Sequence, residues 1–154
     1  MDTRLERAVA RAKRRFMGDL KSRYGISEDD IRVVVKPRGR GYVSMYRSRS
    51  QYDGSPLFWI SGSLESAAAE LGESLEDVAY DCIAHEYGHA VHEFAAAQDA
   101  GLWRLVERGW GYDEEPFAEG FVWLFRGLAG TDDKTRYAGV LRRYRALAFE
   151  GEGS

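Results

Sequence analysis

All three histidines of this 154-residue chain lie within eight positions, 85–92, in the stretch AHEYGHAVH. On a helix, His85 and His89 present their imidazoles on one face, one turn apart, where a single metal ion can bind both. Glu86 lies about 100° around the helix from His85, close enough to reach a water on that ion without binding it. The HExxH arrangement of residues 85–89 therefore predicts one Zn²⁺ per chain, with Glu86 as the general base of a hydrolase.

A catalytic zinc normally has three protein ligands and one open position. Glu115 and Glu119 stand four residues apart in an otherwise apolar segment, where buried unpaired carboxylates are costly. We predict that Glu115 is the third ligand and that Glu119 accepts a histidine N–H. Two alternatives remain: His92 as the third ligand, although it lies two turns from His85, and both glutamates simply facing water.

The segments HEYGHAV and EEPFAEGF, at residues 85–91 and 114–121, resemble glutamate-zincin (gluzincin) metallopeptidases, and locally the anthrax lethal factor type. The resemblance covers residues 57–126. It implies a zincin-like fold and a peptide or protein substrate. It also implies zinc on His85, His89 and Glu115, Glu86 as the base, and Glu119 supporting a ligand histidine.

The chain departs from that family where a catalytic tyrosine is expected, seven residues before the glutamate ligand. Arg108 occupies this position, so Tyr112, or otherwise Trp110, is the candidate for stabilising the oxyanion. The metzincin pattern HExxHxxGxxH does not fit, because His92 stands where it requires glycine and Ala95 where it requires histidine.

The sequence patterns of the helices and strands around these residues predict an α+β fold in a single domain, residues 1–154. Residues 2–24 show helical spacing of apolar positions, and residues 31–36, 42–47 and 57–61 read as strands. Their short connections favour a small, mostly antiparallel sheet backed by the N-terminal helix, with 57–61 as a possible edge strand for an extended substrate. We expect further helices over 75–97, from 114 or 115 to 128, and over 131–149.

Gly88 stands inside the predicted metal-binding helix, where glycine is less favourable than alanine by about 1 kcal/mol. We therefore expect another backbone, such as the glutamate helix, to approach closely at Gly88.

Charge and composition bear on whether the protein binds nucleic acid, is secreted or spans a membrane. Residues 1–52 carry 14 Lys and Arg against 6 Asp and Glu, whereas the remainder is acidic. A solvated helix and hairpin explain this better than a nucleic-acid surface. The single cysteine, Cys82, fits a reducing compartment. No signal peptide or membrane span is evident, so we expect a cytoplasmic protein. A zinc-stabilised, non-catalytic binding module and a nucleic-acid adaptor are the competing functions.

Overall fold

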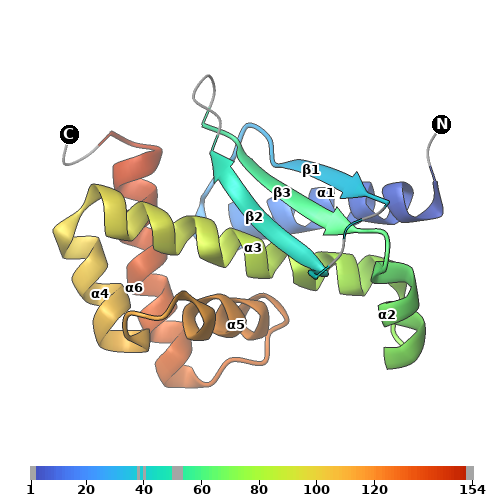
Figure 1. The fold of residues 1–154 in the computed structure, drawn as a ribbon. Helices are drawn as coiled ribbons and strands as arrows, with labels where there is room; N and C mark the ends of the chain where they lie inside the picture. Colours follow the sequence, from blue (N-terminus) through green and yellow to red (C-terminus); the bar gives the residue numbers. More distant parts are fainter. Residues whose placement is uncertain (1–2, 38, 40, 50–53, 152–154) are drawn as a thin grey trace.

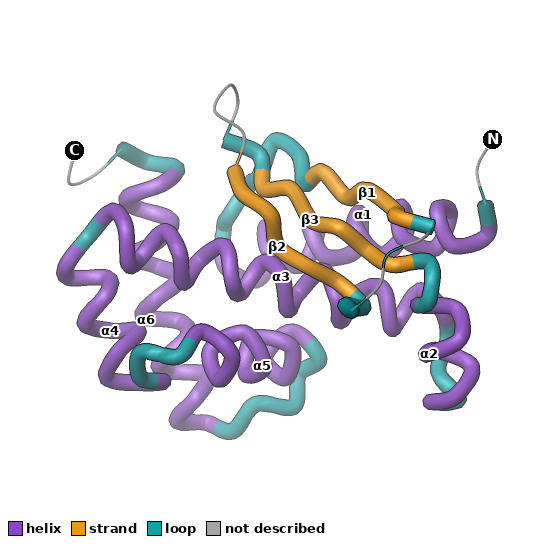
Figure 2. Tube along the Cα trace, viewed as in Figure 1, coloured by secondary structure: helices purple, strands orange, loops and turns teal. Residues whose placement is uncertain are grey.

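The computed structural model describes residues 3–37, 39, 41–49 and 54–151. These residues form a small sheet with helices packed against one of its faces, and further helices beyond them (Figures 1 and 2). The elements, in chain order, are α1 (Arg4–Tyr24), β1 (Arg32–Lys36), β2 (Ser44–Arg49), β3 (Pro56–Ser61), α2 (Leu64–Leu71), α3 (Leu75–Gln98), α4 (Ala100–Trp110), α5 (Glu114–Phe125) and α6 (Thr131–Ala148). The predicted α+β class is confirmed. No helix in the described part of the chain is both long and apolar enough to span a bilayer.

The sheet is mixed, with the strand order β1-β3-β2. β2 pairs with β3 antiparallel, whereas β1 pairs with β3 parallel. The prediction of a mostly antiparallel sheet is therefore wrong for β1, which does not pair with β2, the next strand in sequence. The prediction of 57–61 as an edge strand is also wrong. Phe58 and Ile60 of β3 are fully buried, so this strand gains most from the central position, while the polar β2 is suited to an edge.

α1 and α3 cover one face of the sheet and lie behind it in the view of Figure 1. α1 begins at the cap residue Thr3 and ends at Gly25, which adopts the left-handed conformation with φ of 68°. Its buried positions follow the predicted helical spacing: Leu5, Ala8, Val9, Ala12, Phe16 and Leu20. The predicted amphipathic N-terminal helix is thus confirmed.

α3 runs through the centre of the molecule, between α1 and α5 (Figure 1). It begins after Ser74, whose hydroxyl caps the helix by accepting a hydrogen bond from the Asp77 N–H. Fourteen of its residues are buried, because neighbours pack against it on several sides. α5 and α6 match the other predicted helices, although α5 ends earlier, at Phe125.

Candidate metal centre

The structure brings His85, His89 and Glu115 together, although 30 residues separate His85 from Glu115 along the chain. His85 Nε2 lies 3.2 Å from Glu115 Oε2, and His89 Nε2 lies 3.1 Å from Glu115 Oε1. One ligand atom from each of the three residues lies within 4.8 Å of the others, and no other such group of three occurs among the described residues. Two imidazole nitrogens and a carboxylate oxygen are a donor set that suits Zn²⁺.

Close packing of α5 on α3 places Glu115 at this position. A Cβ on Gly88 would lie only 3.0 Å from Ala118 Cα, so the α5 backbone approaches at the predicted glycine. At the start of α5, the Asp113 carboxylate accepts a hydrogen bond of 3.0 Å from the Glu115 N–H. The tight contact fixes the position of α5 along α3, and the cap fixes where α5 begins. Together they place Glu115 beside the histidines.

Glu86 is buried and joins α3 to strand β2. Its Oε2 accepts a 2.5 Å hydrogen bond from the Ser44 hydroxyl, and its Oε1 accepts a 2.8 Å hydrogen bond from the Tyr46 N–H. Burial acts to raise the pKa of the Glu86 carboxyl, but the hydrogen bonds from His85 and Ser44 outweigh it and lower the pKa. Glu86 is therefore a charged, firmly positioned group beside the histidines.

The same carboxylate orients His85. His85 Nδ1 lies 2.9 Å from Glu86 Oε2, where an Nδ1–H can donate to the carboxylate, and Nε2 faces Glu115. Burial acts to lower the pKa of His85, but the hydrogen bond to Glu86 and the charges of Glu86 and Glu115 raise it. Without a metal ion, the two carboxylates thus stabilise protonated His85 relative to a free histidine.

His89 is more buried than His85, but fewer hydrogen bonds orient its ring. Its Nδ1 lies 3.5 Å from Glu114 Oε1, which is close enough for charge attraction. The geometry does not make a hydrogen bond, and Nδ1 has no such partner in the described part of the chain. Its Nε2 is accordingly the atom directed at Glu115.

His92, the alternative third ligand, lies apart from this group. Its ring packs at 5.1 Å from the ring of Trp103 and at 5.9 Å from that of Phe117. Burial lowers the pKa of His92, and its Nε2 has no hydrogen-bond partner among the described residues. Its position favours a neutral histidine within an aromatic cluster.

Two predicted site residues are not brought to the histidines. Glu119 is exposed, and no hydrogen bond joins it to a histidine in the part that the structure describes. Tyr112 is 76% exposed, with its ring 6.3 Å from that of Trp103, and a hydrogen bond to Glu107 raises the pKa of its hydroxyl. Trp110 packs against Phe117.

A cleft of about 320 Å³ opens beside the histidines, between β2 and the start of α5. Its lining includes Met45, Arg47, Glu93 and Glu114, none of which the sequence motifs identified. Glu93 accepts a 3.0 Å hydrogen bond from the Tyr46 hydroxyl. Met45 and Arg47 have no characteristic spacing from the HExxH motif, because strand β2 reaches the site only through tertiary packing, whereas Glu93 lies on α3 one turn after His89 and Glu114 begins α5.

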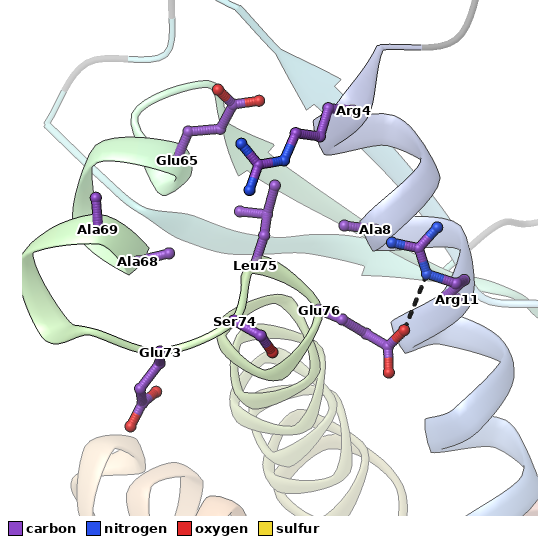
Figure 3. Close-up of a pocket in the computed structure, with 10 residues that line it drawn as sticks. All are labelled: Arg4, Ala8, Arg11, Glu65, Ala68, Ala69, Glu73, Ser74, Leu75 and Glu76. Atoms are coloured by element: carbon purple, nitrogen blue, oxygen red, sulfur yellow. Dashed lines mark hydrogen bonds and ion pairs between the residues drawn. The ribbon is translucent and has the colours of Figure 1, made fainter.

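A larger hollow, of about 500 Å³, lies between α1, α2 and the start of α3 (Figure 3). It is lined by charged side chains of both signs, and Arg11 pairs with Glu76 there at 3.0 Å. It contains no histidine or cysteine. The chemistry of a metal site is therefore concentrated at the smaller cleft.

Comparisons of the chain with known protein families, with curated proteins and with solved structures gave no match.

Proposed function

We propose that this protein is a zinc-dependent metallopeptidase that hydrolyses peptide bonds. The convergence of His85, His89 and Glu115, next to the buried carboxylate of Glu86, carries the proposal. Zn²⁺ bound there would lower the pKa of a water to about 7 and polarise the scissile carbonyl.

The chain's own groups supply the proton transfers. Glu86 takes the proton of the attacking water on a carboxylate oxygen and delivers it to the leaving amine. The Ser44 hydroxyl and the Tyr46 N–H hold this carboxylate in place, so that little reorganisation precedes the transfer. Glu119 is proposed to support a ligand histidine, which requires its exposed side chain to turn toward the site.

Two groups are available to stabilise negative charge on the carbonyl oxygen. The Tyr112 hydroxyl must break its hydrogen bond with Glu107 to reach the cleft, whereas Arg47 already lines the cleft. Arg47 is also the only Lys or Arg among the described residues that line the cleft. We therefore propose Arg47 beside Tyr112 as a candidate for this role.

The position of β2 supports an extended peptide as the substrate. β2 is an edge strand beside the cleft, and an extended peptide can pair with a free strand edge through main-chain hydrogen bonds. Because the Tyr46 N–H donates to Glu86, the peptide would pair with other main-chain groups of β2.

One observation favours a second candidate, a zinc-stabilised module without catalytic activity. The Glu86 carboxylate makes three contacts at hydrogen-bond distance, to Ser44, Tyr46 and His85. The bonds from Ser44 and Tyr46 tie α3 to β2, and the hydrogen bonds from His85 and Ser44 lower the pKa of Glu86, which weakens it as a base. In this alternative the carboxylate stabilises the fold and orients His85 only.

The two functions are distinguished by Glu86→Gln, which keeps the size of the side chain and removes its charge. The zinc-loaded variant and wild type are incubated with a peptide mixture, and the products are identified by mass spectrometry. Glu93→Gln is the control, because it alters a carboxylate of the same cleft that does not contact His85.

The metallopeptidase proposal expects cleavage by wild type and Glu93→Gln, and a rate reduced by about 10²-fold or more in Glu86→Gln. Equal cleavage by Glu86→Gln and wild type would contradict the role of Glu86. No cleavage by any zinc-loaded form would favour the non-catalytic module.

A further inference from the structure

No helix among the described residues covers the face of the sheet that points away from α1 and α3, and this is the face seen in Figure 1. In β1, Val33 and Val35 pack toward the core, so Arg32, Val34 and Lys36 lie on this outer face. Trp59 of β3 pairs in register with Val34 on one side and with Met45 on the other. We call the set Arg32, Val34, Lys36, Met45, Arg47 and Trp59 the outer sheet face.

Cations surround the tryptophan of this face. Lys36 Nζ lies 4.5 Å from the centre of the Trp59 ring, and the Arg47 guanidinium carbon lies 4.2 Å from it. Tyr42 adds a second aromatic ring, 6.4 Å away. An aromatic ring between cationic side chains, on an open sheet, is the combination that binds single-stranded nucleic acids, because bases stack and phosphates bind the cations.

The charges of the outer sheet face are also unbalanced. Arg32, Lys36 and Arg47 form no ion pair with any carboxylate in the described part of the chain. The basic residues of α1 differ, because several pair with acidic ones, such as Lys13 with Asp30 at 2.9 Å. The basic charge of the N-terminal third is therefore neutralised in part on the helix and remains available on the sheet.

We propose that the outer sheet face binds a single-stranded nucleic acid. A base stacks on Trp59 in place of a cation that now lies over its ring, and the phosphates bind Arg32, Lys36 and Arg47. This function does not require the proposed peptidase activity, although Arg47 also lines the cleft of the metal centre. β1 is the strand at the opposite edge of the sheet from β2 and the metal centre. Changes in β1 therefore test the outer sheet face without altering the cleft.

Three phosphate contacts on a single strand predict a salt dependence of log K with a slope of about −2. The affinity then falls about 20-fold when the salt concentration rises from about 50 mM to 200 mM. Removing two of the three cations leaves a slope of about −0.7, which corresponds to about a threefold loss over the same range.

The test is fluorescence anisotropy with the full chain and a labelled oligothymidylate of about 20 nucleotides, long enough to cover the face. Wild type is compared with Arg32→Ala/Lys36→Ala. The control is Lys134→Ala/Arg142→Ala, which removes the same charge from exposed positions of α6. Trp59→Ala and Trp59→Phe test stacking, and the phenylalanine variant retains an aromatic ring if the alanine variant does not fold.

Salt-dependent binding by wild type and the α6 control, with the shallower slope for Arg32→Ala/Lys36→Ala, is the expected result. Trp59→Ala is expected to bind at least about fivefold more weakly, with Trp59→Phe close to wild type. Absence of binding at low salt, or equal slopes for the two double variants, would overturn the proposal. Equally tight binding of a polyglutamate peptide of the same charge would show attraction by charge alone and would also overturn it.

Discussion

Gly88 sits where the metal-binding helix touches the helix that carries Glu115, and Gly88→Ala tests whether this contact sets the geometry of the site. The new Cβ would lie 3.0 Å from Ala118 Cα, 3.1 Å from Phe121 Cβ and 3.3 Å from Phe121 Cγ. These atoms belong to the backbone or to the base of a ring, so they cannot move away without moving α5. Any relaxation must displace Glu115 from His85 and His89.

The magnitude follows from two opposing effects. Alanine gains about 1 kcal/mol over glycine inside a helix. Overpacking a well-packed core costs about 1–3 kcal/mol. Gly18→Ala is the matched control, because Gly18 lies inside α1 with no atom within 4 Å of its added Cβ. Both variants gain the same helix propensity, so the difference between their free energies of unfolding isolates the packing cost.

The assay is urea denaturation of the metal-free variants, followed by a zinc titration against a competing chelator. We expect Gly18→Ala to be more stable than wild type, and Gly88→Ala to be about 1–3 kcal/mol less stable than Gly18→Ala. We also expect Gly88→Ala to bind zinc about tenfold more weakly, as when a supporting contact of a metal site is lost. Equal stability of the two variants with unchanged zinc affinity would show that the contact at Gly88 does not set the geometry of the site.

Three further predictions concern a buried ion pair, a buried thiol, and the pH dependence of stability in the metal-free protein. Glu28 is 5% exposed and pairs with Arg49 at 3.1 Å, so Glu28→Ala leaves a partly buried charge unpaired. Urea denaturation should show a loss of about 3 kcal/mol, and a loss below about 1 kcal/mol would contradict a buried ion pair. Burial raises the pKa of the Cys82 thiol to about 12, so a thiol reagent should label it slowly in the native protein and quickly in denaturant. Similar labelling rates in both conditions would contradict that burial. In the metal-free protein, the raised pKa of His85 supplies stability that is present below its ordinary value of 6.5 and lost as the pH rises through the raised value. The lowered pKa of Glu86 supplies stability that is present above its ordinary value of 4.5 and lost as the pH falls through the lowered value. Urea midpoints should therefore decrease on both sides of the range from about pH 4.5 to 6.5, and no decrease above that range would contradict the shift of His85.

The sequence was most informative where chemistry depends on short spacings. The four-residue spacing of His85 and His89 determines that they share a helix face. The apolar surroundings of Glu115 predicted a helix that packs against them. Gly88 correctly indicated the close backbone approach of α5, because a glycine inside a helix needs a reason in its packing.

Features that depend on long-range pairing were not predictable in this way. The central position of β3 depends on how three strands compete for partners, which their individual patterns do not specify. The exposed position of Tyr112 depends on the path of the loop before α5. α4 was missed because only Asp99 separates it from α3, without the glycine or proline that usually marks a helix end.

The proposed metal centre is tested by the zinc content of protein purified without added metal, determined by elemental analysis. Wild type, Glu115→Ala and His92→Phe are compared, since phenylalanine can keep the aromatic packing of His92 with Trp103. We predict one zinc per chain in wild type and His92→Phe, and loss of zinc in Glu115→Ala. Zinc retained in Glu115→Ala, or its absence from folded wild type, would contradict the proposed ligand set.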